Sequence, residues 1–360
     1  MRYIGNKTRL LDFIATALAE RGIDAHNASS PVAVDPFCGT ASVASELKRR
    51  GFRVIASDIM EYAWVLARAY VQVSAEPDLG RLAAQLRLPD TTLATLIEHA
   101  NALPPRAGFV HDHYSPAGRE GGEHGRMYFT PGNAARIDAI RQAIHDWQGS
   151  GLIDDDAACM LLAALLEAAD RIANTTGVYA AFVKSWQPNA TRPLALRAPD
   201  IVAGEGSIAR RVDAFRATNE AGPFHLLYLD PPYNNRQYAG YYHIPEIIAR
   251  GWFDGRIRTR GKTGLIDDHD KRSDWSRRRR CEAVFEQLVA TTGWKHLVMS
   301  YNAEGIIPEP VIERVLREHG RASTFERKSL TYRRYRSDAD GENRRYSGDT
   351  VTEYLYCVSR

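Results

Sequence analysis

Cysteine is scarce in this sequence, and the few cysteines lack the spacing of a metal or redox site. The 360-residue chain has four, Cys38, Cys159, Cys281 and Cys357, and none belongs to a CxxC pair. A chain of this length can bury a sizeable core without disulfides. We therefore expect free thiols, no metal site and a reducing compartment, the cytoplasm.

Long apolar runs and a strong net charge are also missing. No stretch reaches the ~18 apolar residues of a membrane span, and MRYIGNK has no apolar signal-peptide core, so we expect no membrane association. A net charge of +3 is too small to indicate a nucleic-acid partner by itself. The basic excess is local, because residues 250–280 hold eleven Lys or Arg against five acids, and residues 321–345 hold eight against four.

The most informative stretch is Asp230-Pro231-Pro232-Tyr233. It follows the apolar, β-prone run Phe224–Leu229, which predicts a buried parallel strand. The motif would then lie at the carboxyl end of a strand, where open α/β sheets bind ligands. Two prolines make the turn stiff and leave carbonyls free, while Asp230 adds a carboxylate and Tyr233 an aromatic face. This combination suits the exocyclic amine of a nucleobase, although an ordinary strand-ending turn is the simpler alternative.

The amino-terminal region predicts a strand–turn–helix–strand unit that ends in an acid. We expect a helix from Lys7 to Arg21, a strand at Pro31–Val34, a helix at Ser42–Arg50 and a strand at Arg53–Ala56. Gly39 lies in the first turn and allows close approach of a ligand to the backbone. Asp58 follows nineteen residues later, a spacing that suits ribose hydroxyls. Alone, this signal is weak.

The rest of the chain predicts one α/β domain that is split by a helical insert. The domain would comprise residues 1–59 and 200–360, and the insert residues 60–199. Within the insert we expect helices at 60–101, 134–147 and 154–174, a long loop at 103–132, and an irregular segment at 175–199. After it we expect helices at 207–215, 276–291 and 309–318, and strands at 296–300 and 350–359.

The motifs together resemble a known family. RYIGNK, DPFCGT, Asp58 and DPPY, in this order, resemble the alpha group of DNA adenine N6-methyltransferases. RYIGNKTRLLDFI, NTTGVYAAFVKSW, DPPYNNRQYAGYYH and SYNAEG resemble more closely the methyltransferases of FokI-like type IIS restriction systems. The resemblance implies a Rossmann-like, mostly parallel seven-stranded sheet that binds S-adenosylmethionine, with the helical insert as the target-recognition domain.

The resemblance also implies an activity and its partners. The enzyme would transfer a methyl group from S-adenosylmethionine, releasing S-adenosylhomocysteine, to a flipped-out adenine at a specific site in duplex DNA. It would work within a restriction-modification system, with a cognate restriction endonuclease as a candidate partner, or as an orphan enzyme. It would be associated with the bacterial nucleoid when bound to DNA.

Residue roles follow from the same resemblance. Lys7 would lie beside the cofactor's methionine carboxylate, Asp58 would hold the ribose hydroxyls, and Glu205 would bind the cofactor's adenine. The remaining cofactor contacts would be Tyr3, Gly5, Asn6, Asp35, Pro36, Phe37, Cys38, Gly39 and Thr40. The catalytic residues would be Asp230, Pro231, Pro232 and Tyr233. Apart from the resemblance, the loop after DPPY and the basic, aromatic run 332–336 suggest nucleic-acid contacts at Arg236, Tyr238, Tyr241, Lys262, Arg333, Arg334 and Arg336.

Two positions depart from the family pattern, and other functions stay open. Ala41 replaces the usual last glycine of the first motif, and Asn6 stands where Gly or Ser is more usual. An RNA adenine methyltransferase could use the same residues, and a non-catalytic nucleic-acid-binding module could keep the same fold. Cytosine N4-methylation is less favoured because its motif commonly begins with Ser, and a dinucleotide dehydrogenase because the chain lacks GxGxxG.

Overall fold

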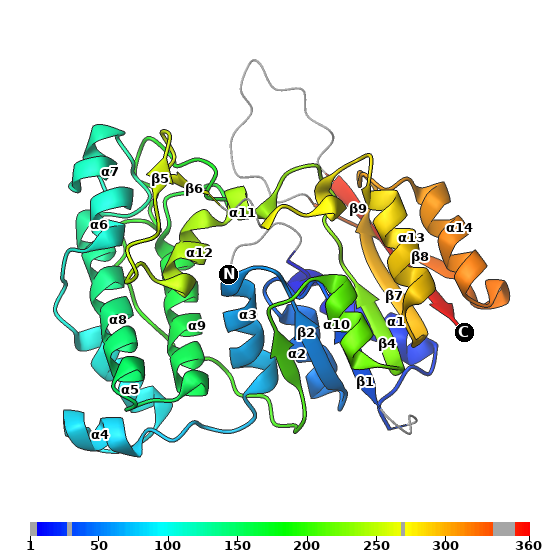
Figure 1. Cartoon of the computed structure of the whole chain (residues 1–360), viewed down its shortest axis with the longest axis horizontal. Helices are drawn as coiled ribbons and strands as arrows, with labels where there is room; N and C mark the ends of the chain where they lie inside the picture. The colour runs from blue at the N-terminus through cyan, green and yellow to red at the C-terminus, as the bar shows by residue number, and fades with distance from the viewer. Residues whose placement is uncertain (1–5, 27–30, 268–270, 334–349) are drawn as a thin grey trace. The chain divides into compact units, whose positions relative to one another are not determined.

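The computed structural model describes residues 6–26, 31–267, 271–333 and 350–360, which form two compact units. The sheet unit comprises Asn6–Ile59, Gly204–Gln237 and Arg272–Arg360, and the helical unit comprises Met60–Ala203 and Tyr238–Lys271. The segment 238–271, which the sequence assigned to the α/β domain, therefore groups with the helices. It does so because α12 (His243–Arg250) packs against α3 (Glu61–Ala67) and α9 (Asp155–Ile172) (Figure 1).

The sheet unit is built on a seven-stranded sheet in the order β3-β2-β1-β4-β7-β9-β8. Its strands are β1 (Val32–Asp35), β2 (Arg53–Ser57), β3 (Ile208–Arg210), β4 (Phe224–Leu229), β7 (Trp294–Asn302), β8 (Glu326–Arg333) and β9 (Thr350–Ser359). The first five strands in that order pair in parallel, and β9 runs antiparallel to both of its neighbours. The expected Rossmann-like, mostly parallel sheet is confirmed.

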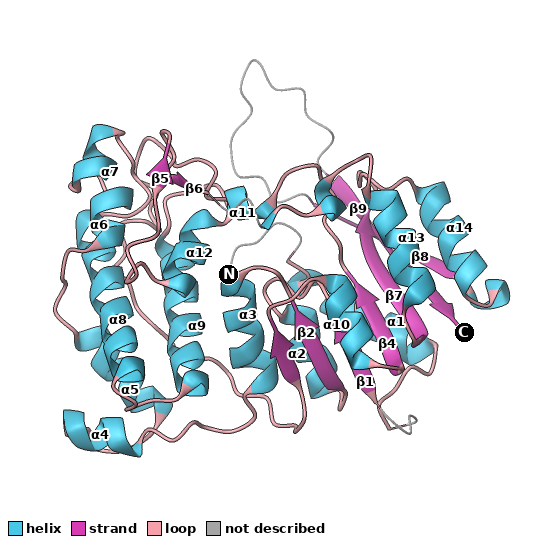
Figure 2. Ribbon diagram, in the orientation of Figure 1, coloured by secondary structure: helices cyan, strands magenta, loops and turns pink. Residues whose placement is uncertain are grey.

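Helices cover both faces of this sheet. They are η1 (Thr8–Leu10), α1 (Leu11–Glu20), α2 (Ser42–Arg49), α10 (Ala214–Ala221), η4 (Asp274–Ser276), α13 (Cys281–Thr291), α14 (Glu309–His319) and η5 (Ala322–Thr324). The helices α10, α13 and α14 share one core with the apolar strand residues, and α1 packs with α2 on the opposite face (Figure 2). Coverage on both faces explains why every residue of β1 and β4 is buried and why most of them are apolar.

The strand order predicts where this sheet binds a ligand. Successive strands are added on one side of β1 up to β3, and the next strand, β4, pairs with the other side of β1. A change of direction in the strand order of this kind opens a crevice at the carboxyl ends of the strands. Asp35 ends β1 and Asp230 directly follows β4, so both acids lie at this edge.

The helical unit surrounds one almost fully buried helix, α9. The other helical segments are α3, the π-turn η2 (Arg68–Gln72), α4 (Gly80–Leu86), α5 (Leu93–Ala102), α6 (Phe109–Tyr114), α7 (Arg119–Glu123), α8 (Pro131–Gly149), α11 (Tyr238–Tyr241) and α12. A short hairpin joins β5 (Thr259–Arg260) to β6 (Leu265–Ile266). In the described part of the chain, no helix has both the length and the apolar character needed to cross a bilayer.

Two expectations about local structure were wrong, and one long strand was missed. The segment 103–132 is not one loop, because it contains α6 and α7. The amino end of α6 is stabilised by the carboxylate of Asp138, on α8, which accepts hydrogen bonds from the N–H groups of Gly108, Val110 and His111. The expected helix 207–215 is instead β3 followed by α10, which begins after its cap Asp213. Strand β8 was not predicted.

Candidate active site at the carboxyl edge of the sheet

Asp230 lies beside a buried lysine from the amino-terminal segment. The Nζ atom of Lys7 is 3.1 Å from Asp230 Oδ1 and 2.6 Å from Glu353 Oε1. The side chains of Lys7 and Glu353 are 3% and 2% exposed, whereas that of Asp230 is 17% exposed. Asp230 Oδ1 is itself buried and, apart from the Lys7 ammonium, has no hydrogen-bond donor among the described residues. A buried carboxylate oxygen with so few donors can accept a further hydrogen bond from a ligand.

The charges of this cluster shift one another. Burial raises the pKa of Asp230, the ammonium of Lys7 lowers it, and Glu353 raises it, so that it lies at about 7. The carboxylates of Asp230 and Glu353 hold the pKa of Lys7 above its ordinary value although burial opposes this. Burial and the nearby Asp230 also raise the pKa of Asp35. One cation thus faces several acids, and the site favours a positively charged ligand.

The turn after β1 forms a backbone cradle next to these acids. The N–H of Phe37 donates to Asp35 Oδ1 at 3.3 Å, and that of Gly39 donates to Asp58 Oδ2 at 3.2 Å. Gly39 has φ +48°, a left-handed conformation that favours glycine. The ring of Phe37 meets Trp275 edge-on at 4.8 Å, which fixes the position of the turn against α13 and its neighbours. The turn therefore brings Asp35, Gly39 and Asp58 close together, as the sequence predicted.

The remaining residues of the DPFCGT motif lie in the same turn. Pro36 and Cys38 are buried, Thr40 is partly exposed, and the N–H of Cys38 binds the carbonyl of Ser57 at 3.0 Å. Burial raises the pKa of the Cys38 thiol, the opposite of what a reactive cysteine needs. All four cysteines are free and buried.

Both departures from the family pattern have a structural consequence. Ala41 is fully buried and has φ 59° and ψ 15°, the left-handed conformation in which glycine is usual. The methyl group therefore fits the space but strains the backbone. Asn6 caps the first turn of η1, because its Oδ1 accepts hydrogen bonds from the N–H and hydroxyl of Thr8 at 2.9 and 2.6 Å. Asn6 supports the segment that positions Lys7.

One predicted cofactor contact lies elsewhere than expected, and a second is held by other partners. Glu205 is exposed and lies three residues before the start of β3. Ser207, just before β3, accepts a hydrogen bond from the N–H of Val54, near the start of β2. Because β2 and β3 are parallel, Glu205 is at the amino edge of the sheet, away from Asp58. Lys7 reaches the expected region, but its ammonium is held by two protein carboxylates. Tyr3 and Gly5 lie outside the described residues.

The DPPY motif is partly buried against the core of the sheet unit. Pro231 is buried, Pro232 and Tyr233 are partly exposed, and Tyr233 packs against the core of the sheet unit. The Lys7 ammonium lies 5.7 Å from the centre of the Tyr233 ring, within the range of a cation–π contact. One face of the ring is thus ordered by Lys7.

The predicted nucleic-acid contacts are spread over both units. In the sheet unit, Arg236 is exposed on the loop after DPPY, and its N–H binds the side chain of Asn234. In the helical unit, Tyr238 and Tyr241 form α11, and Lys262 is exposed at the tip of the β5–β6 hairpin. Arg333 ends β8, while Arg334 and Arg336 lie outside the described residues.

Sequence reasoning missed residues on the late strands. Glu353 on β9 and Ser300 on β7 join the Lys7 cluster, and Tyr228 on β4 lies close enough to affect its charges. Glu353 and Ser300 lie far from the DPPY and DPFCGT motifs along the chain. The only sequence signal was a single acid in the otherwise apolar alternation of Thr350–Ser359.

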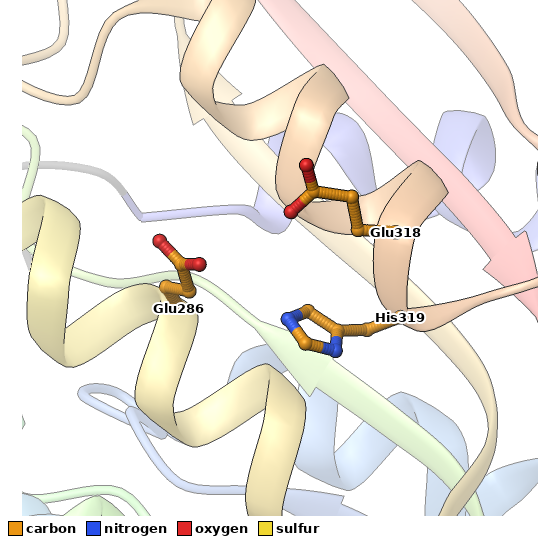
Figure 3. A group of neighbouring side chains, drawn as sticks. All are labelled: Glu286, Glu318 and His319. Carbon is orange, nitrogen blue, oxygen red and sulfur yellow. The ribbon is translucent and has the colours of Figure 1, made fainter.

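A second group of acids, on α13 and α14, has a different explanation. Glu286, Glu318 and His319 place potential ligand atoms close together, as Figure 3 shows. Arg314 already donates hydrogen bonds to Glu286 at 2.9 Å and to Glu318 at 2.8 Å. We interpret this group as an ion-pair network that joins the two helices.

Comparison with known proteins agrees with this geometry. The family model described as "D12 class N6 adenine-specific DNA methyltransferase" matches residues 3–273. The chain is 33% identical over 363 residues to the type II methyltransferase M.NlaIII of Neisseria lactamica, covering all of this chain and 99% of the relative. It is 31% identical over 364 residues to the type II methyltransferase M.FokI of Planomicrobium okeanokoites, and 29% identical over 365 residues to the modification methylase StsI of Streptococcus sanguinis.

The extent of these matches differs between relatives. The whole chain aligns with all three, but it spans only 53% of M.FokI and 52% of StsI. By contrast, it spans 99% of M.NlaIII. With its DPPY site on a seven-stranded, mostly parallel sheet, the chain belongs to the D12 class of N6 adenine-specific DNA methyltransferases.

Proposed function

We propose that this protein transfers a methyl group from S-adenosylmethionine to the N6 amine of an adenine that is flipped out of a specific site in duplex DNA. The observation that carries the proposal is Asp230, a buried acceptor that follows β4 at the switch point of the sheet. The amine lone pair of adenine is delocalised into the ring, so the amine is a poor nucleophile. Acceptors aimed at its hydrogens localise that pair as the nitrogen becomes tetrahedral.

Asp230 and the motif's backbone would supply these acceptors. The carboxylate and the Pro231 carbonyl would each accept one amine hydrogen, and Tyr233 would stack on the base. The methyl–sulfur bond breaks as the methyl–nitrogen bond forms, so the sulfonium becomes a thioether and the positive charge passes to N6. The amine then loses one proton to water. Asp230 stabilises the developing charge by electrostatics and is not required to be a strong base.

The residues at this edge suit the proposed cofactor, which supplies an electrophilic methyl group on a cationic sulfur. Asp35, Asp58 and Asp230 give the edge a negative potential that favours a cation. The turn that contains Gly39 brings its backbone close to the ligand, and Asp58 would hold the ribose hydroxyls. We withdraw Glu205 from this set and reassign Lys7 to the charge balance of Asp230.

The DNA contacts remain proposals. We propose the helical unit as the target-recognition domain, and Arg236, Tyr238, Tyr241, Lys262, Arg333, Arg334 and Arg336 as candidate contacts with DNA. A base within a duplex must be flipped out before it can reach DPPY, which costs a few kcal/mol. Because its substrate is duplex DNA, we place the protein in the bacterial cytoplasm with the nucleoid, with a cognate restriction endonuclease as a possible partner in the host.

The test is direct detection of the product. DNA from cells that express the protein would be sequenced with detection of modified bases, beside DNA from cells that express the Asp230→Ala variant. We expect N6-methyladenine at one short recurring sequence with the parent protein and none with the variant. Methylation of RNA alone, or no methylation by well-folded parent protein, would overturn the proposal.

A further inference from the structure

The last long strand of the sheet contributes a buried carboxylate to the reacting edge. Glu353, on β9, accepts hydrogen bonds at a single oxygen, Oε1, from Lys7 Nζ at 2.6 Å and from Ser300 Oγ at 2.7 Å. Strand register explains the contact, because Glu353 pairs with Asn302 on β7, two residues from Ser300. Glu353 lies outside residues 3–273, the part of the chain that the family model matches.

We propose that Glu353 is a positioning residue for methyl transfer, which holds the Lys7 ammonium so that Asp230 keeps a free lone pair for the adenine amine. The inference rests on the proposed role of Asp230. The distances support it, because the lysine is closer to Glu353, at 2.6 Å, than to Asp230, at 3.1 Å. A lysine paired with Asp230 alone would neutralise the carboxylate and occupy the oxygen that the adenine amine needs.

Ser300 makes this arrangement specific rather than a chance ion pair. Its hydroxyl binds the same Glu353 oxygen as Lys7 and so limits the positions that the carboxylate can take. Glu353 is 2% exposed, and burial of its charge costs desolvation free energy. A residue that only filled space in the sheet would not need a charge at this position. An apolar residue in its place would suit the packing of β9, whose neighbours Val351 and Leu355 are buried on the same face.

The charge balance makes the inference testable by pH. Among the described residues, the groups that face Asp230 are Lys7 from the amino-terminal segment, Asp35 from β1, Tyr228 from β4, Tyr301 from β7 and Glu353 from β9. With both Asp230 and Glu353 ionised, Lys7 leaves a net charge of −1 in this group of three. Glu353→Gln keeps the shape and the acceptor oxygen but removes one negative charge, so Asp230 should lose its proton at lower pH.

The experiment is single-turnover transfer of labelled methyl between pH 5 and 9, on a duplex that carries the sequence identified by modified-base detection. We expect the acid limb of the parent enzyme near pH 7. In Glu353→Gln we expect it about one pH unit lower, with a plateau rate about tenfold lower because Lys7 shifts toward Asp230. Affinity for S-adenosylmethionine should change little.

Two controls separate charge from structure. Glu326→Gln, on the neighbouring strand β8, removes an acid that pairs with Arg21 and should leave the pH profile unchanged. Ser300→Ala keeps all charges and should reduce the rate without lowering the acid limb. If Glu353→Gln does not fold, the double variant Lys7→Met/Glu353→Gln removes the pair together, and its acid limb should move to higher pH because the nearest cation is gone.

The outcomes distinguish this inference from the proposed function. An unchanged acid limb and rate in well-folded Glu353→Gln would show that Glu353 only packs, and would leave the role of Asp230 intact. A double variant whose acid limb moves to lower pH would also overturn the inference. Full activity of Asp230→Ala would instead refute the proposed function on which it rests.

Discussion

The two units each bury a basic side chain, but they satisfy its charge in different ways. In the sheet unit, Lys7 faces the carboxylates of Asp230 and Glu353. In the helical unit, fully buried Arg126 donates hydrogen bonds to the carbonyls of His113 at 2.9 Å, Gly261 at 2.8 Å and Lys262 at 3.1 Å, with Glu120 3.7 Å away. Carbonyls cannot titrate, whereas carboxylates can.

The difference suggests what each unit is built to do. Buried donors bind every carbonyl of the hairpin turn 261–264, since Tyr128 and His243 contact that of Thr263 and Tyr114 binds that of Gly264. Gly264 has φ +71°, and a Cβ there would come within 2.7 Å of Tyr114. The helical unit thus fixes the backbone of the turn 261–264, which carries the exposed Lys262. The sheet unit instead balances the charge of Lys7 against those of Asp230 and Glu353.

The largest expected effect would break the helical half of this comparison. Arg126→Met removes three hydrogen bonds and leaves buried carbonyls without donors, so we expect it to lower the free energy of unfolding by about 3–5 kcal/mol. Chemical denaturation checks this, and the matched control is Arg119→Met, an exposed position on α7 that should change it by less than about 0.5 kcal/mol. Equal stability of the two variants would show that Arg126 does not hold the hairpin.

The next effect concerns ligand binding in the sheet unit. Asp58→Ala should weaken binding of S-adenosylmethionine by about 1.5–3 kcal/mol, because a charged acceptor is lost while the fold remains. Glu205→Ala is the control and should bind as the parent does, since Glu205 lies at the opposite edge of the sheet. Titration calorimetry that found the reverse order would restore Glu205 to the site and remove Asp58.

A smaller effect tests the strained turn. Ala41→Gly should stabilise the protein by roughly 0.5–1 kcal/mol, because relief of the left-handed strain exceeds the added freedom of the unfolded chain. Ala44→Gly, in the interior of α2, should instead destabilise it by about 1 kcal/mol or more. Thermal unfolding of both variants gives the answer, and a loss of stability in both would mean that the methyl group of Ala41 contributes packing that outweighs its strain.

The smallest expected effect sharpens the role of the hairpin. If Lys262 contacts one phosphate, Lys262→Ala should reduce the log–log salt slope of DNA binding by about 0.9 and weaken all sequences alike. Lys295→Ala, at the exposed amino end of β7, should leave the slope unchanged. The same slope for parent and Lys262→Ala protein would make Lys262 a solvated surface residue.

The same two regions show what can be predicted from sequence. Strand β4 has the predicted bounds Phe224–Leu229, and Asp230 lies at the expected edge, because apolar patterning and the prolines act locally. Helix α6 was missed because its amino end is stabilised by Asp138, a side chain from another helix. Glu353 was missed because its role depends on a contact with Lys7, which is 346 positions away in the chain.

The central claim is that Asp230 acts as an ionised acceptor during methyl transfer, and Asp230→Asn tests it most directly. Single-turnover transfer to the identified DNA site should fall about a hundred- to a thousandfold, with cofactor and DNA affinities nearly unchanged. The parent rate should rise as pH increases through about 7, where the raised pKa of Asp230 places its ionisation, and the variant should lose this dependence. An Asp230→Asn enzyme that transfers methyl at the parent rate with the parent pH profile would contradict the account.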